Sequence, residues 1–172
     1  MTNDAEPFPA ALTAIAGVEF EYGEDGGVDF YGDEQFTDPA EMTEWFRAWT
    51  GNDEVTGDAF RVFGRDGTGG LAAFWLVRDG QPVEHQPVVF LGSEGETGVV
   101  ASNLSDLLWL FADGVGPCEA VTPYDEPLTP SVEVLAIAER WATPPKRSAT
   151  EIVSAARAEF PHFEPLIDDL CR

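Results

Sequence analysis

Short apolar segments alternate with turns between residues 59 and 101. The segments are AFRVF at 59–63, LAAFWLV at 71–77, PVVFL at 87–91 and TGVVA at 97–101. Those at 71–77 and 87–91 are apolar on both faces, which is typical of inner strands in a sheet that helices cover. The pattern predicts a sheet with a buried centre, around which the rest of the chain must pack.

The turn between the first two segments, FGRDGTGG at 63–70, has the glycine content of a ligand-binding loop. It lacks the Lys and Ser or Thr of a phosphate-binding loop, and a strand follows it where a dinucleotide fingerprint requires a helix. Of the side chains that an EF-hand calcium loop requires, only Asp66 is in place. We therefore predict a structural turn in which glycines adopt positive φ and Asp66 accepts local backbone hydrogen bonds. The residues of this turn are Gly64, Asp66, Gly67 and Gly69.

The segment at 18–34, VEFEYGEDGGVDFYGDE, is acidic and alternates in polarity. Val18, Phe20 and Tyr22 alternate with two glutamates, which is the period of a strand with one buried face. GEDGG can then reverse the chain, so that residues 28–31 return as the partner strand. We expect an acidic hairpin here.

A helix is expected at 39–50, within TDPAEMTEWFRAWTG. Asp38 can cap this helix, Pro39 suits its first position, and the apolar residues recur at helical spacing. Gly51 supplies a stop signal.

The C-terminal part of the chain is expected to be mainly helical. SNLSDLLWLFADG predicts a helix between a cap at Ser102 or Asn103 and a stop at Gly114. The Pro-rich stretch at 115–130 predicts a loop or linker. Further helices are expected at 131–141, 149–159 and 163–170. We therefore divide the chain into an α+β domain, residues 1–130, and a helical C-terminal extension, residues 131–172, packed on or beside it.

The chain of 172 residues has a formal net charge of −23, and 44% of its residues are hydrophobic. The apolar content is sufficient for a folded core, whereas the charge disfavours direct binding of nucleic acid or anionic membranes. The acids are concentrated in the first 58 residues, where Arg47 is the single base. No apolar run is long enough for a membrane span and no basic leader is present, so we expect a cytoplasmic protein.

The sequence predicts no catalytic residue. A nucleophile elbow requires glycine two positions before the serine, and Leu91 stands there before the serine of LGSEGETG at 91–98. His85 lies in an expected exposed turn and His162 lies between Pro and Phe in the tail, which disfavours a Ser-His triad. Cys118 and Cys171 lack the spacing of a zinc or redox motif. We expect no enzyme activity, no cofactor and no metal site.

The order of elements in AFRVFGRDGTGGLAAFWLV and PVVFLGSEGETGVVASNLSDLLWLFADG is strand, Gly-Asp-Gly turn, strand, strand, short strand, amphipathic helix. This order, over residues 36–114, resembles the SUKH superfamily, which includes the Smi/Knr fungal cell-wall regulators and many bacterial toxin-immunity proteins. The resemblance implies an α+β fold with a mainly antiparallel sheet packed against helices. It also implies a non-enzymatic protein that binds and neutralises a cognate polymorphic toxin, often a nuclease. The residues that match the family pattern are Gly64, Asp66, Gly67 and Gly69 in the turn, Phe74 or Trp75 in the next strand, and Leu104, Leu107 and Leu108 in the helix.

Our leading hypothesis from the sequence is an immunity protein whose acidic N-terminal third covers a basic toxin domain. Its carboxylates would mimic the phosphates that a nuclease site holds. The side chains expected to bind the partner are Asp25, Asp29, Asp33 and Glu34.

Other functions remain open at this point. One is a regulatory scaffold of the SUKH fold that binds cellular partners, without a toxin, through TPPKRS at 143–148 and PHFEPLI at 161–167. Another is a metal-dependent hydrolase that uses the same acids or Asp66, although a solvated acidic face explains them more simply. General adaptation to solubility or high salt would also produce such acidity.

Overall fold

The computed structural model describes residues 6–23, 26–122 and 128–172. Its centre is a five-stranded sheet in which each strand pairs antiparallel with the next one along the chain. The strands in spatial order are β3 (Tyr31–Gly32), β4 (Phe60–Arg65), β5 (Leu71–Trp75), β6 (Val88–Leu91) and β7 (Thr97–Ala101). The predicted α+β class, with an antiparallel sheet packed against helices, is confirmed.

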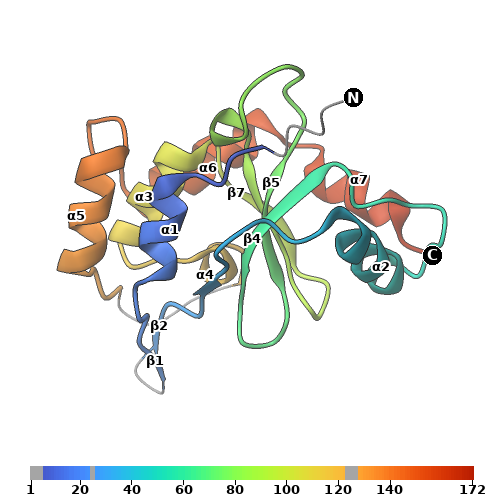
Figure 1. The fold of residues 1–172 in the computed structure, drawn as a ribbon, viewed down its shortest axis with the longest axis horizontal. Helices are drawn as coiled ribbons and strands as arrows, with labels where there is room; N and C mark the ends of the chain where they lie inside the picture. The colour runs from blue at the N-terminus through green and yellow to red at the C-terminus, as the bar shows by residue number, and fades with distance from the viewer. Residues whose placement is uncertain (1–5, 24–25, 123–127) are drawn as a thin grey trace.

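Helices cover both faces of this sheet (Figure 1). One face carries α1 (Ala10–Ala16), α3 (Leu104–Ala112) and α5 (Val132–Trp141), and the other carries α2 (Pro39–Thr50) and α7 (Phe163–Leu170). α6 (Ala149–Glu159) packs against β7, and its residues Ile152 and Ala156 join the cores on opposite faces. The helices of the C-terminal extension therefore contribute to the core on both sides of the sheet.

Strand β5 shows how the sheet separates two hydrophobic clusters. Ala72 and Phe74 pack in the cluster of α1, α3 and α5, whereas Leu71 and Ala73 pack in the cluster of α2 and α7. This follows from the period of two in a strand, which directs successive side chains to opposite faces. Ala72, Ala73 and Phe74 are 0% exposed. Because both faces are covered, an inner strand must be apolar at every position.

The helix ends follow the capping signals in the sequence. The Asp38 side chain accepts a hydrogen bond from Ala40 N at 2.9 Å, and Gly51 ends α2 in the left-handed region with a φ of 66°. Asn103 caps α3 by accepting a hydrogen bond from Asp106 N at 2.8 Å. The helices expected at 39–50, 149–159 and 163–170 have these bounds in the structure.

Two further helices occur that the sequence does not predict. α1 begins after Pro9 and lacks a side-chain cap, so its start carries no polar signal. α4 (Pro117–Val121) lies within the stretch at 115–130, and the prediction of a loop is wrong for these residues. Pro117 occupies the first turn, and the Glu119 carboxylate accepts a hydrogen bond from Gly116 N at 3.0 Å. These are helix-start signals that the Pro-rich composition concealed.

The acidic hairpin is shorter than expected. β1 (Tyr22–Gly23) pairs with β2 (Gly26–Gly27), but the chain beyond them continues to β3, which pairs with β4. Val28 N still donates to Glu21 O at 3.3 Å, but Tyr31 pairs with β4, so the prediction that the whole segment 28–31 returns along the first strand is wrong. Tyr22, expected on a buried face, is 64% exposed. Phe30 accounts for the difference, because its buried ring contacts Phe63 and Phe111 and draws this segment into the core.

Candidate functional site

The turn between β4 and β5 is built around the buried carboxylate of Asp66. Its Oδ1 atom accepts hydrogen bonds from Thr68 N at 3.0 Å, Thr68 Oγ1 at 2.9 Å and Gly70 N at 2.8 Å. Gly69 has a φ of 94°, which favours glycine. The expected Asx-type turn is present, and the turn itself occupies the Asp66 carboxylate.

Asp29, in the connection from β2 to β3, links this connection to the β4–β5 turn and to α4. Its Oδ1 atom accepts a hydrogen bond from Gly67 N at 2.9 Å, and its own N–H donates to Glu119 Oε1 at 2.8 Å. Burial raises the pKa of Glu119, and the negative charge of Asp29 raises it further. Burial also raises the pKa of the neighbouring Cys118 thiol to about 12. These contacts hold the β2–β3 connection, the β4–β5 turn and α4 together. Glu119 is one of the contacting residues, and the sequence does not indicate this role because its Pro-rich composition predicts a loop there.

The other described acids expected to bind a partner lie directly after β3. Asp33 forms an ion pair with Arg65 of β4, with 3.3 Å between Oδ2 and the guanidinium. Glu34 is exposed, and Asp25 lies outside the described residues. Of the three described acids, Asp29 and Asp33 are therefore engaged within the fold, and Glu34 presents its carboxylate to solvent.

Further exposed acids occur on α2, on the loop that follows it and on α7. These helices meet at their C-terminal ends, where Asn52 Nδ2 donates to Leu170 O at 2.8 Å and Arg172 N donates to Thr50 O at 2.9 Å. None of the exposed carboxylates of this α2–α7 layer forms an ion pair within the described ranges. We call this surface the acidic face. Its exposed acids are Glu41, Glu44, Asp53, Glu54, Asp58, Glu164, Asp168 and Asp169.

Two tryptophans on α2 add aromatic surface to this layer. The rings of Trp45 and Trp49 are stacked, with centroids 5.5 Å apart and planes 17° apart, and both residues are half-buried. Trp49 Nε1 donates to Gly92 O at 2.7 Å, which fixes the orientation of its ring. Partly exposed indoles are enriched at protein interfaces, so the layer combines negative charge with rigid aromatic side chains.

An apolar pocket of about 280 Å³ opens where α6 meets α7. Its walls include Trp75 from β5, Phe160 and Phe163 from the helix junction, and Leu166 from α7. The ring centroid of Trp75 lies 5.6 Å from that of Phe160 and 4.9 Å from that of Phe163. Leu166 is 44% exposed. We call this feature the elbow pocket; it includes part of the PHFEPLI segment at 161–167.

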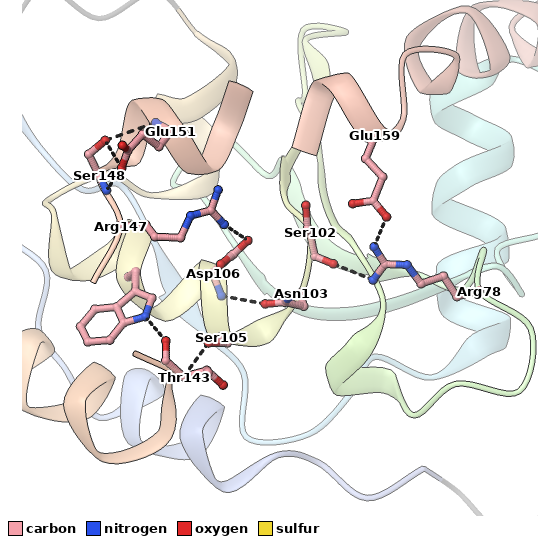
Figure 2. Close-up of polar contacts among 11 residues, drawn as sticks. Arg78, Ser102, Asn103, Ser105, Asp106, Thr143, Arg147, Ser148, Glu151 and Glu159 are labelled. Carbon is pink, nitrogen blue, oxygen red and sulfur yellow. Dashed lines mark hydrogen bonds and ion pairs between the residues drawn. The ribbon is translucent and has the colours of Figure 1, made fainter. Parts of the chain in front are cut away.

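A second cavity, of about 500 Å³, lies at the start of α3 between α1, α5 and the connection from β5 to β6. Its lining is mixed and includes the side chains of His85, Asn103, Ser105 and Thr143. Figure 2 shows the polar contacts at this place, among them a hydrogen bond of 2.7 Å from Thr143 N to Ser105 Oγ. Thr143 O also accepts a hydrogen bond from Trp109 Nε1 at 2.9 Å. Most of these groups position α5 against α3.

The arginines beside this cavity also make internal contacts (Figure 2). Arg78 donates to the backbone oxygens of Ser102, at 2.8 Å, and His85, and it pairs with Glu159. Arg147 pairs with Asp106 at 2.9 Å. In the TPPKRS segment, the ion pair with Asp106 therefore partly neutralises the charge of Arg147, whereas Lys146 is exposed.

Neither a metal-binding cluster nor a bilayer-spanning helix occurs in the ranges that the structure describes. No group of three or more His, Cys, Asp or Glu side chains there is arranged to hold a metal ion, and none of the described helices has both the length and the apolar character of a bilayer span. His85 and His162 are both exposed. Comparisons of the chain with protein-family models, with curated proteins and with solved structures gave no match.

Proposed function

We propose that this protein is a non-enzymatic binding protein that neutralises a cognate basic toxin domain, in the manner of an immunity protein. The acidic face carries this proposal, because it gathers unpaired carboxylates from two segments that are distant in the sequence, 41–58 and 164–169. A toxin that acts on a nucleic acid must present a basic surface to its substrate. The resemblance of residues 36–114 to the SUKH superfamily suggests the same role.

The carboxylates of the acidic face and the two tryptophans of α2 support successive steps of binding. Before contact, unpaired carboxylates attract a basic surface and raise the association rate, an effect that salt screens over about 8 Å at physiological ionic strength. After contact, the half-buried Trp45 and Trp49 offer aromatic surface of the kind that carries binding energy in interfaces. Glu34, exposed directly after β3, adds to the negative surface.

The proposal is tested with the product of the neighbouring gene, expressed with and without this protein. The test variant carries Glu44→Lys and Asp168→Lys, one substitution on each helix of the acidic face. The matched control carries Glu133→Lys and Glu139→Lys, which change the net charge equally at exposed positions on α5, on the other face of the sheet. A third variant, Glu34→Lys, tests the position after β3 separately.

We expect the wild type and the α5 control to rescue growth and to bind the basic product. The acidic-face variant should associate at least about tenfold more slowly at low ionic strength, and its rescue should weaken. Equal binding by both double variants would exclude the acidic face. If the neighbouring product is not toxic, and this protein instead binds a cellular partner, the scaffold function replaces the immunity function.

A further inference from the structure

The elbow pocket has the properties of a receptor for one large apolar side chain. Its apolar walls are the rings of Trp75, Phe160 and Phe163 and the aliphatic side chain of Leu166, and Pro161, His162 and Glu159 complete the lining. An apolar cavity of about 150 Å³ already accommodates benzene, so the volume of about 280 Å³ is sufficient for an aromatic or leucine side chain. Pockets that bury a single aromatic or aliphatic anchor are typical centres of protein interfaces.

The charged groups nearest the pocket indicate what kind of chain would bring that side chain. Glu159 is part of the lining but already pairs with Arg78, whose guanidinium also lies 5.3 Å from the ring centroid of Phe160. Apart from His162, which is exposed, the lining therefore offers apolar contact and an already paired carboxylate. Outside it, the exposed carboxylate of Asp169 follows Leu166 by three positions, on the same side of α7.

The carboxylate of Asp169 and the net negative charge of the chain favour a basic segment beside the apolar anchor. A second copy of this chain is a poor occupant, because each copy has a net charge of −23 and two copies repel one another. An acidic partner is disfavoured for the same reason. Charge complementarity leaves a basic partner whose surface carries a protruding apolar side chain.

We propose that the elbow pocket binds a phenylalanine-sized side chain flanked by Lys or Arg on the toxin, and so serves as the anchor point of the interface. This inference rests on the proposed function and specifies where on the α7 layer the partner is held. The acidic face attracts the basic partner, and the pocket supplies the apolar contact that slows dissociation.

The test uses fluorescein-labelled peptides KKFKK, KKAKK and EEFEE with the full chain, and fluorescence anisotropy at low ionic strength. KKFKK should bind about tenfold more tightly than KKAKK, as expected for burial of one aromatic side chain, and EEFEE should bind more weakly than both. The Leu166→Arg variant fills the pocket mouth with a cation and should abolish the preference for KKFKK. The control, Val132→Arg, changes a residue on α5 that is 85% exposed and should retain it.

The outcomes separate this inference from the proposed function. Equal affinity for KKFKK and KKAKK, or a preference that persists in Leu166→Arg, overturns the pocket and leaves the toxin rescue experiment unaffected. Binding of EEFEE as tight as that of KKFKK overturns the basic character of the occupant. A failure of all three peptides to bind also overturns the pocket, whereas failure of the proposed function is detected only by the loss of rescue and toxin binding.

Discussion

Replacing Asp66 with alanine should be among the most destabilising single changes outside the hydrophobic core. The Asp66 carboxylate is 6% exposed and accepts three hydrogen bonds through one oxygen. Its removal leaves the buried Gly70 N–H without an acceptor, which costs about 2 kcal/mol, and the loss of the bonds to the exposed Thr68 adds about 1 kcal/mol. We expect a loss of about 3 kcal/mol in the free energy of unfolding, equivalent to a Tm lower by about 6–12 °C for a chain of this size.

Chemical denaturation followed by tryptophan fluorescence measures this loss as a lower midpoint with an unchanged slope. The matched variant Asp66→Asn keeps an oxygen acceptor in place and should lose only about 1 kcal/mol. A loss below about 1 kcal/mol for Asp66→Ala would refute the assignment of Asp66 as the organiser of the turn. Equal losses for the two variants would show that the charge, and not the acceptor geometry, is what matters.

Three further predictions follow from the other contacts. Because the pKa of Glu119 is raised above its ordinary value of 4.5, the native state binds a proton there that the unfolded chain has released. The contribution of Glu119 to the free energy of unfolding is then present below pH 4.5 and is lost as the pH rises through its raised pKa. Glu119→Gln should therefore flatten the pH dependence of the free energy of unfolding between pH 4.5 and that raised pKa. An unchanged pH dependence contradicts this prediction. With a pKa of about 12, the Cys118 thiol should react with a disulfide reagent at pH 8 far more slowly than the exposed Cys171, and a Cys171→Ser variant that still labels rapidly would disprove this. Asp38→Ala removes the cap of α2 and should cost about 1 kcal/mol in chemical denaturation, whereas Glu41→Ala on the same helix, at an exposed position, serves as the control for loss of charge.

The sheet and most helices are predictable because their signals are local. Because helices cover both sides of the sheet, strands β5 and β6 must be apolar on both faces. Residues 71–75 and 88–91 show this apolar pattern in the sequence itself. The cap at Asp38 and the stop at Gly51 are likewise set by backbone hydrogen bonding within one turn. Such features need no knowledge of distant segments.

The candidate sites depend on contacts between distant segments, and sequence reasoning therefore missed most of them. The acidic face combines α2 and α7, which pack in one hydrophobic cluster and meet at the hydrogen bond between Asn52 and Leu170, 118 positions apart. A count of charge along the chain points only to the N-terminal third. The acidic sequence around Asp29 predicts a partner-binding carboxylate, but this carboxylate accepts a hydrogen bond from Gly67 N in the β4–β5 turn. Phe160 and Leu166 have no pattern that indicates a pocket, because Trp75 of β5 completes its wall.

The double cover of the sheet also provides a way to measure binding without a label. Strands β5 and β6 occupy inner positions in the sheet, and their side chains at 72–74 and 88–89 are 0% exposed. Their amide hydrogens should exchange with solvent only when the whole protein unfolds. A partner that binds only the native state raises the free energy of unfolding by RT ln(1 + [L]/Kd), and the exchange of these amides slows accordingly. The exchange rates of these two strands therefore report the affinity of any partner, whichever face it occupies.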